Sequence, residues 1–211
     1  MTDQIAAAAH QKPTVFVVDD DPAVCGAISA GITKVIGLPV QSYTSADAFL
    51  AEYDAKRPGC LVLDVKMPGM SGLELQEALR ARGAHLPVIM ISGHAEVRTA
   101  VKAMKNGALS LLEKPFDMQQ LEEHIRQALK IDAGARDKAE RREAISDRLA
   151  ALTSREREIM GLLVEGKTNK EIALALGTSL PTVDKHRWKV FEKMRVDNVV
   201  ELFRLMSELA E

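Results

Sequence analysis

Residues 60–82 read CLVLDVKMPGMSGLELQEALRAR. The segment opens with the apolar run Cys60–Leu63, which has the length and content of a buried strand. Asp64 follows directly, a Pro- and Gly-containing turn comes next, and Leu73–Arg82 then carries apolar residues at helical spacing. A buried strand that ends in a carboxylate and leads into a helix predicts one unit of a parallel α/β sheet.

The same alternation recurs on both sides of this segment. Four more apolar runs of strand length occupy Thr14–Val18, Pro39–Tyr43, Pro87–Ile91 and Ala108–Leu112. Further helical patterns occupy Pro22–Ile36, Ala46–Ala55, Glu96–Asn106 and Met118–Lys130. Alternating strands and helices predict parallel βαβ units, so we expect a five-stranded, doubly wound parallel α/β sheet with helices on both faces.

Composition limits the class of protein. The 211 residues are 46% hydrophobic and 27% charged, with a net charge of -2, which suits one or two globular domains. Cys25 and Cys60 are too few for a disulfide framework, so we expect reduced, buried thiols. Because neither a secretory signal nor an apolar run of about 20 residues is visible, we expect a cytoplasmic protein without membrane association.

The second half carries helical patterns only. A charged, Ala-rich segment predicts a partly helical linker, with a solvated extension of the preceding helix as the open alternative. Four short helices with Gly-containing turns follow at Ser154–Glu165, Asn169–Leu176, Pro181–Met194 and Asn198–Leu209. They predict a small all-α domain of the helix-turn-helix kind. The expected division is an N-terminal tail at 1–13, the α/β domain at 14–131, the linker at 132–147 and the helical domain at 148–211.

Polar residues follow the predicted strands of the first half. They are Asp19, Asp20, Asp21, Asp64, Ser92 and Lys114. The carboxyl ends of parallel strands meet at one edge of a sheet, so these side chains are expected to converge. Converging carboxylates suit a hard cation such as Mg²⁺, and a lysine can pair with a carboxylate or a phosphoryl group. The set therefore fits a carboxylate nucleophile that accepts a phosphoryl group, whereas Asp21, before Pro22, is better read as a helix cap.

The first half resembles the receiver domain of two-component response regulators. The matching segments are VVDDDP (Val17–Pro22), LVLDVKMPGMSG (Leu61–Gly72), MISGH (Met90–His94) and EKPF (Glu113–Phe116). Their order and separations fit over residues 14–131. The resemblance implies a flavodoxin-like receiver fold, with a sensor histidine kinase as the phosphoryl donor.

The resemblance also implies roles for single residues. Asp64 would be the phosphoacceptor. Mg²⁺ would be held by the carboxylates of Asp19, Asp20 and Asp64 and by the backbone carbonyl of Lys66.

Three more residues would contact or report the phosphoryl group. Lys114 would pair with Asp64 and then with the phosphoryl group, and its bond to Pro115 would be cis as in the family. Ser92 would turn toward the phosphoryl group. The family usually carries an aromatic switch residue where this chain has Leu111, so the switch is expected to be weaker or differently coupled.

The second half resembles the LuxR-type helix-turn-helix domain, and the whole chain resembles the FixJ and NarL group of regulators. The matching segments are LTSRERE (Leu152–Glu158), GKTNKEIA (166–173) and TVDKHR (Thr182–Arg187). Pro181–Met194 would be the recognition helix in the major groove of double-stranded DNA. The last helix would pair two such domains or, alternatively, pack entirely into its own.

The candidate DNA-binding residues are Thr182, Asp184, Lys185, His186, Arg187, Trp188 and Lys189. The resemblance places Asp184, Lys185 and Trp188 toward base edges. Asp184 could accept from cytosine N4 or pair with a neighbouring Lys or Arg. Trp188 could contact a thymine methyl or pack against the domain.

The combined expectation is a transcription regulator rather than an enzyme. Phosphorylation of Asp64 would promote homodimerisation through Glu96–Asn106 and Ala108–Leu112, and the dimer would bind DNA and act with RNA polymerase. One alternative is a regulator that works without phosphorylation. Another is a phosphotransferase of the haloacid-dehalogenase type, but its pattern needs an aspartate where this chain has Lys66.

Overall fold

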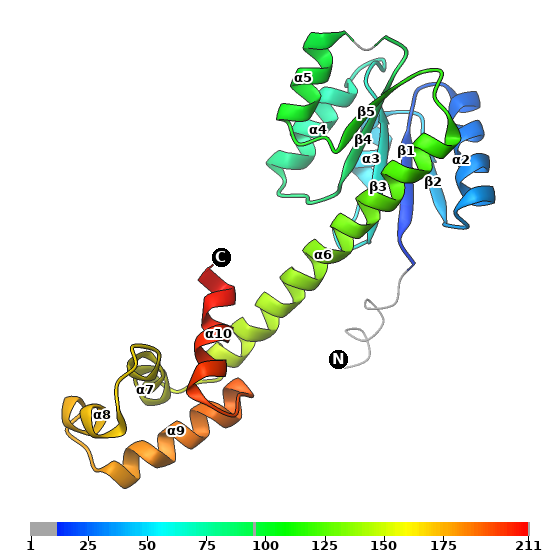
Figure 1. Ribbon diagram of the computed structural model, residues 1–211. Coiled ribbons are helices and arrows are strands. Elements are labelled where there is room, and N and C mark those ends of the chain that lie inside the picture. The colour runs from blue at the N-terminus through cyan, green and yellow to red at the C-terminus, as the bar shows by residue number, and fades with distance from the viewer. Residues whose placement is uncertain (1–11, 95, 211) are drawn as a thin grey trace. The chain divides into compact units, whose positions relative to one another are not determined.

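The computed structural model describes residues 12–94 and 96–210 (Figure 1). It divides into two compact units, Met1–Arg136 and Asp137–Glu211, which we describe separately. Of the expected N-terminal tail, residues 1–11 lie outside the described residues.

The described part of the first unit contains a five-stranded parallel sheet. Its strands are β1 (Thr14–Val18), β2 (Val40–Tyr43), β3 (Gly59–Asp64), β4 (Val88–Ser92) and β5 (Ser110–Glu113). Their order in the sheet is β2-β1-β3-β4-β5, and every recorded pairing is parallel. The expected doubly wound α/β fold is thereby confirmed.

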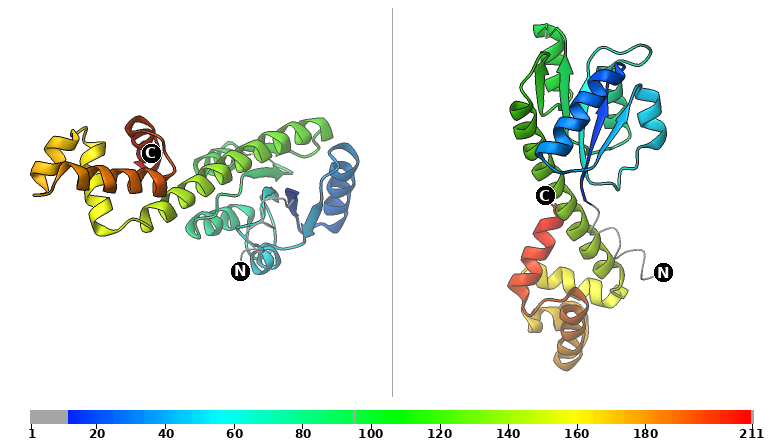
Figure 2. Two further views of the ribbon diagram at one scale, coloured as in Figure 1. Left: turned by 90° about the horizontal axis from the view of Figure 1, so that it is seen from below. Right: turned by 90° about the vertical axis from the view of Figure 1, so that its right-hand side faces the viewer.

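Helices cover both faces of this sheet (Figure 2). One face packs against α2 (Pro22–Val35) and the first part of α6 (Met118–Ala150). The other face packs against α3 (Ala46–Glu52), α4 (Gly72–Ala81) and α5 (Val97–Lys105). Alternate residues of a strand point to opposite faces, so Val15 and Val17 face one layer while Phe16 and Val18 face the other.

Helix α6 corrects one sequence-based boundary. We expected a helix that ends at Lys130, but α6 continues without a break to Ala150. Thus the segment 132–147 is helical throughout, which agrees with the alternative of an extended last helix. The physical reason is composition: the segment is rich in Ala, Arg and Glu, which favour helices, and it contains no proline.

The second unit is all-helical in its described part. Its helices are α7 (Ser154–Val164), α8 (Asn169–Ala175), α9 (Leu180–Met194) and α10 (Val199–Ala210). Hydroxyl side chains cap the first three of them, because Thr153, Thr168 and Ser179 each accept from a backbone amide of the following turn. Apolar residues from all four helices, with Ile145 of α6, form one core.

Both cysteines are buried and free, and burial raises the pKa of the Cys60 thiol to about 12, so this thiol stays protonated. Within the described ranges, no helix is both long enough and apolar enough to span a bilayer.

Candidate functional site

The carboxyl edge of the sheet brings together two carboxylates and one ammonium group. Lys114 follows β5, and its Nζ lies 2.6 Å from Asp19 Oδ2 and 2.6 Å from Asp64 Oδ1. Asp19 follows β1 and Asp64 ends β3, so residues up to 95 positions apart meet at one point. Both carboxylates are buried, and Asp64 Oδ2 also accepts from the Lys66 amide at 2.7 Å. Hydrogen bonds to both of its oxygens therefore fix the orientation of the Asp64 carboxylate.

Burial and charge act against each other at this point. Burial raises the pKa of the Asp64 carboxyl, and the hydrogen bond and charge of Lys114 offset only part of that rise. For Lys114, burial lowers the pKa, but the hydrogen bonds to Asp19 and Asp64 outweigh it, so the pKa of the amine is raised. Lys114 therefore stays charged and balances one of the two buried carboxylates.

The donor set fits a hard divalent cation. Two buried carboxylates, those of Asp19 and Asp64, face the single Lys114 ammonium, and the exposed Asp20 follows Asp19 in the sequence, so an excess of negative charge remains. Mg²⁺ typically takes one or two carboxylates and completes its shell with water and phosphate oxygens. Among the described residues no three His, Cys, Asp or Glu side chains are close enough to hold a metal unaided, so carbonyl and water oxygens would be needed.

Asp21 does not belong to this cluster. Its side chain accepts from the Ala23 amide at 2.8 Å and caps α2, as the sequence indicated. The Asp21 amide donates to Asp19 Oδ1 at 3.0 Å, which helps to orient that carboxylate.

Ser92 and Leu111 lie near the site but contact other groups. Ser92 is buried at the end of β4, where its hydroxyl donates to the His94 carbonyl at 2.9 Å rather than to Asp64. Leu111 is half-buried on β5 opposite Met90 and packs on the core that contains α3, α4 and α5. The Lys114–Pro115 peptide bond is cis, which confirms that expectation.

Gly72 is a site residue that sequence reasoning missed. It starts α4, and its amide donates to the Val65 carbonyl at 3.1 Å. A Cβ atom at this position would collide with the Asp64 carbonyl oxygen. The signal in the sequence was Ser71, a typical helix-capping residue. With Ser71 as the cap, the helix starts at Gly72, one residue before the expected Leu73.

Helix α9 presents a polar face to solvent in the second unit. Val183, Val190 and Met194 are buried in the core, whereas the opposite side exposes Asp184, Lys185 and Trp188. Trp188 is 63% exposed, so it does not pack into its own domain. The remaining candidates are partly buried: Thr182 hydrogen-bonds with Ser179, His186 has an unpartnered buried Nδ1, and Lys189 lies on the flank.

One amide side chain of α8 connects two charged residues of α9. Asn169 Nδ2 donates to Asp184 Oδ1 at 2.6 Å, and Arg187 donates to Asn169 Oδ1 at 3.3 Å. The Arg187 guanidinium also lies over the Phe191 ring, 5.1 Å from its centroid. One of the two alternatives gave Asp184 a Lys or Arg partner, but in the folded chain its carboxylate accepts from the neutral Asn169. From the sequence, Asn169 was only the first residue of the expected helix Asn169–Leu176.

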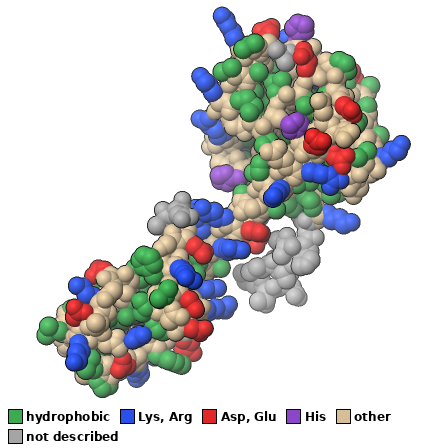
Figure 3. Space-filling model, in the orientation of Figure 1, with side chains coloured by type: hydrophobic (Ala, Val, Ile, Leu, Met, Phe, Trp, Pro, Cys, Tyr) green, Lys and Arg blue, Asp and Glu red, His purple; other side chains and the backbone are tan. Residues whose placement is uncertain are grey.

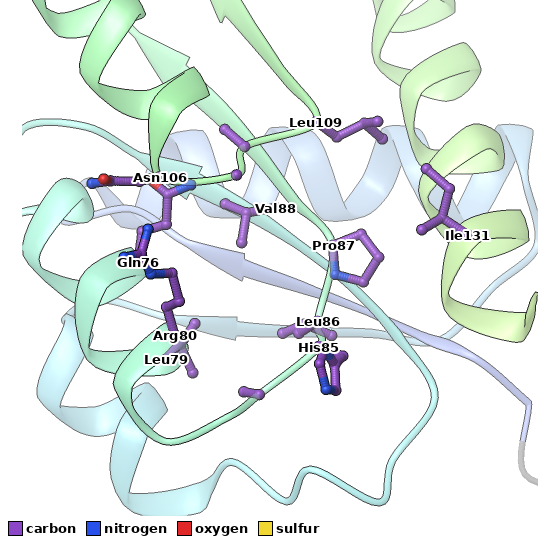
Figure 4. A pocket seen from close by; sticks show the side chains of 13 residues that line it. Gln76, Leu79, Arg80, His85, Leu86, Pro87, Val88, Asn106, Leu109 and Ile131 are labelled. Carbon is purple, nitrogen blue, oxygen red and sulfur yellow. The ribbon is translucent and has the colours of Figure 1, made fainter. Parts of the chain in front are cut away.

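A separate hollow lies at the opposite edge of the sheet (Figure 4). It has a volume of about 410 Å³ and opens between the start of β4 and the C-terminal ends of α4 and α5. Apolar walls come from Leu86, Pro87, Val88 and Leu109, with Ile131 at one side. Because β4 begins here and ends at Ser92, the hollow is distinct from the Asp64 cluster.

Comparison with known families accounts for both units. The chain matches the response regulator receiver domain over residues 15–126 and the luxR family of bacterial regulatory proteins over residues 150–206. The chain belongs to the response regulators. In this family a sensor kinase is the partner of the receiver domain and DNA binding is the output, so this response regulator is a two-component regulator of transcription and not an enzyme. The dehalogenase-type alternative is not supported.

Relatives of this response regulator match over most of their length. It is 44% identical to the transcriptional regulatory protein FixJ of Azorhizobium caulinodans over 194 residues, 90% of each chain. It is 38% identical to the response regulator protein TodT of Pseudomonas putida over 197 residues, 93% of this chain and 86% of that one. These relatives are of the FixJ/NarL type, as the motifs indicated.

Solved structures agree with this assignment. The response regulator StyR has a TM-score of 0.85 and 38% identity, with 94% of this chain and 100% of that chain covered. Full-length FixJ from B. japonicum has a TM-score of 0.57 and 33% identity, with 95% and 98% covered. Receiver domains of this family bind Mg²⁺ at the phosphoaspartate site.

Proposed function

We propose that Asp64 of this response regulator accepts a phosphoryl group from a sensor histidine kinase. The observation that carries the proposal is the contact of Lys114 with both Asp19 and Asp64 at 2.6 Å, because it places a fixed positive charge at the nucleophile. A carboxylate oxygen of Asp64 would attack phosphorus, the P–N bond of the kinase phosphohistidine would break, and the imidazole would leave with the bond electrons and take up a proton.

Asp19, Asp20, Asp64 and the carbonyl oxygen of Lys66 would hold Mg²⁺ beside the nucleophile. When bound, the cation would neutralise charge on the phosphoryl oxygens. The excess of carboxylates over ammonium groups supports this assignment.

Ser92 would serve as the sensor of phosphorylation. Its hydroxyl now donates to the His94 carbonyl, and a phosphoryl oxygen on Asp64 would offer a stronger, charged acceptor. Rotation of the hydroxyl would release that carbonyl and change the loop that leads into α5. Since Leu111 replaces the usual aromatic ring, we assign the coupling to this loop instead of a ring flip.

Phosphorylation would promote a homodimer through α5 and the adjacent β5. Figure 3 shows hydrophobic and basic side chains side by side over the region of the first unit where Figure 1 places α5. The residues of this surface, which we call the α5 surface, are Val97, Arg98, Val101, Lys102, Met104 and Lys105. Val97 is 78% exposed, so the isolated chain leaves apolar area available for a partner.

The outward face of α9 would enter the major groove of DNA. Thr182, His186, Arg187 and Lys189 would contact phosphates, which position the helix, while Asp184, Lys185 and Trp188 would reach base edges. We also propose a receiver domain at 14–131, a helical linker at 132–147 and a DNA-binding domain at 148–211. A cytoplasmic location and a functional partnership with RNA polymerase belong to the same proposal.

The decisive experiment compares the native chain with Asp64→Ala. Both are treated with acetyl phosphate and Mg²⁺, mass is followed by light scattering, and binding is measured on DNA from upstream of the chain's own gene. We expect dimers and tighter DNA binding for the native chain only.

The matched control is Asp21→Asn, which removes a neighbouring carboxylate but keeps an amide oxygen for the cap of α2. This variant should respond like the native chain. Equal DNA binding and unchanged mass for the native chain and Asp64→Ala would instead favour a regulator that works without phosphorylation.

A further inference from the structure

Asp184 is a carboxylate on the exposed face of α9 that is proposed to bind DNA, which is a polyanion. Phosphates repel a carboxylate, so it is tolerated in a DNA interface mainly where it can accept a hydrogen bond. A Lys or Arg partner would cancel this charge. The partner in the folded chain is instead the neutral amide of Asn169, at 2.6 Å, and this contact brings no positive charge to the carboxylate.

One of the two carboxylate oxygens of Asp184 remains available as a hydrogen-bond acceptor. Asn169 holds Oδ1, and within the described part of the chain no hydrogen bond to Oδ2 is recorded. The same amide accepts from Arg187, which is further held over the Phe191 ring. Asn169 therefore orders two opposite charges before DNA arrives, which lowers the entropy cost of presenting them.

Base chemistry selects the target of such an acceptor. In the major groove, cytosine presents the N4 amino donor, and Asp or Glu accepts from it. Adenine also has an amino group, but its N7 acceptor lies beside it and repels a carboxylate. Guanine and thymine present acceptors at these positions.

We propose that Asn169 and Asp184 act together as a specificity-determining pair that selects cytosine at one position of each DNA half-site. This inference rests on the proposed role of α9 in DNA reading. Asp184 makes the base contact, and Asn169 is a positioning residue on the neighbouring helix.

The test is selection of binding sites from a random duplex pool, with the full chain before and after treatment with acetyl phosphate and Mg²⁺. For the native chain we expect one position per half-site with about a tenfold preference for cytosine on one strand, the scale of a good base contact. Asp184→Ala should lose the preference at that position alone, and Asn169→Ala should weaken it. Asp184→Asn should shift it toward adenine, because an amide both donates and accepts.

Two controls separate the pair from the role of the helix. Glu192→Ala removes a carboxylate about two turns later on the same exposed face and should leave the selected sequence unchanged. Lys185→Ala should weaken binding. If Asp184→Ala selects the same sequence as the native chain while Lys185→Ala binds more weakly, the proposed specificity pair is wrong but the role of α9 in DNA binding stands. Native binding in both variants would overturn the pair together with the proposed role of α9.

Discussion

Gly72 shows how a single missing side chain positions the nucleophile. Its backbone lies against the Asp64 carbonyl, so α4 starts immediately beside the strand end that carries the phosphoacceptor candidate. Any Cβ atom would force α4 and the segment after Asp64 apart. The requirement here is for close backbone approach, since Gly72 is not among the glycines with positive φ.

Gly72→Ala is therefore expected to destabilise the first unit by about 1–3 kcal/mol, the usual range for overpacking. It should also slow labelling of Asp64 by acetyl phosphate, because the carboxylate moves relative to Lys114. Hydrogen-exchange mass spectrometry of the first unit and the labelling rate check both effects.

Gly26→Ala is the matched control. Gly26 lies inside α2 and a Cβ atom there meets nothing within 4 Å. This change should be neutral or stabilise the unit by up to about 1 kcal/mol, since alanine favours helices. Native stability and labelling in Gly72→Ala would refute the proposed role of the close approach.

Asp184 and Leu111 show what residue identity does and does not reveal. From the sequence, Leu111 was recognised as a departure from the family pattern and Asp184 as a candidate for contact with a base edge. For Asp184 the two alternatives concerned its partner, and only the folded chain brings Asn169 within 2.6 Å. For Leu111 the sequence predicted the loss of an aromatic switch, and the structure adds that the side chain packs on the core.

At the level of elements, α6 is anchored to the loop before β3. The Arg136 guanidinium donates to the carbonyls of Ala55, Lys56 and Arg57, with the shortest contact at 2.6 Å to Arg57. It also pairs with the buried Asp132, which in turn accepts from the Gly59 amide at 2.9 Å. One arginine thus satisfies three backbone carbonyls and a buried charge.

Breaking this anchor should loosen both elements. Arg136→Gln removes the cation that balances Asp132, so we expect a loss of about 1–3 kcal/mol, the cost of an unsatisfied buried group. Exchange at the Gly59 amide and along α6 around Arg136 should rise. Arg126→Gln removes an exposed pair with Glu122 on the same helix and should cost less than about 0.5 kcal/mol. Equal exchange in the two variants would contradict the anchor.

An ion pair between Glu156 and Lys193 connects α7 to α9. Glu156 is buried at the start of α7, accepts from the Thr153 amide at 2.9 Å and pairs with Lys193 at 2.6 Å. The hydrogen bonds from Lys193 and Thr153 lower the pKa of Glu156 from its ordinary 4.5 to about 2. The stabilising effect is thus complete above pH 4.5 and disappears as pH falls through about 2.

Glu156→Gln should accordingly destabilise the second unit at neutral pH, and its difference from the native chain should shrink as the pH falls from about 4.5 toward 2. Urea unfolding at several pH values measures this difference. Glu171 forms the same capping box with Thr168, but it is exposed, and Lys167 acts on it more weakly than the hydrogen bonds of Thr168 do, so Glu171→Gln should have a smaller effect. A difference that does not vary with pH would exclude this role of the Glu156 charge.

At the scale of the whole molecule, the proposed switch depends on the α5 surface. Val101 lies among Lys102, Lys105 and Arg98, so apolar contact and positive charge are combined on one face. A dimer through this surface has to bury the valines of both copies. It also has to keep the basic residues of one copy from lying directly opposite those of the other. That arrangement would make the monomer–dimer equilibrium sensitive to small changes in α5.

Val101→Glu should therefore abolish dimerisation after phosphorylation while leaving labelling of Asp64 intact, because the change is on the surface. Light scattering and labelling with acetyl phosphate give the two readouts. Val200→Glu places the same charge on an exposed apolar position of α10 and should leave receiver-driven dimerisation intact. Dimers of native stability in Val101→Glu would place the interface elsewhere.

The sequence by itself determined the order of strands and helices, the polar residues at the strand ends and the two family resemblances. These features depend on local periodicity and on motif spacing, and both can be read from the order of residues alone. The full length of α6 was left open between a linker and an extended helix, because its continuation carries charge and little apolar periodicity. Only the tertiary structure decided the contacts of Arg136 with residues 79 to 81 positions away, of Lys193 with Glu156, and of Asn169 with Asp184. Such contacts have no periodic signature, because side chains distant in sequence meet only when the cores have packed.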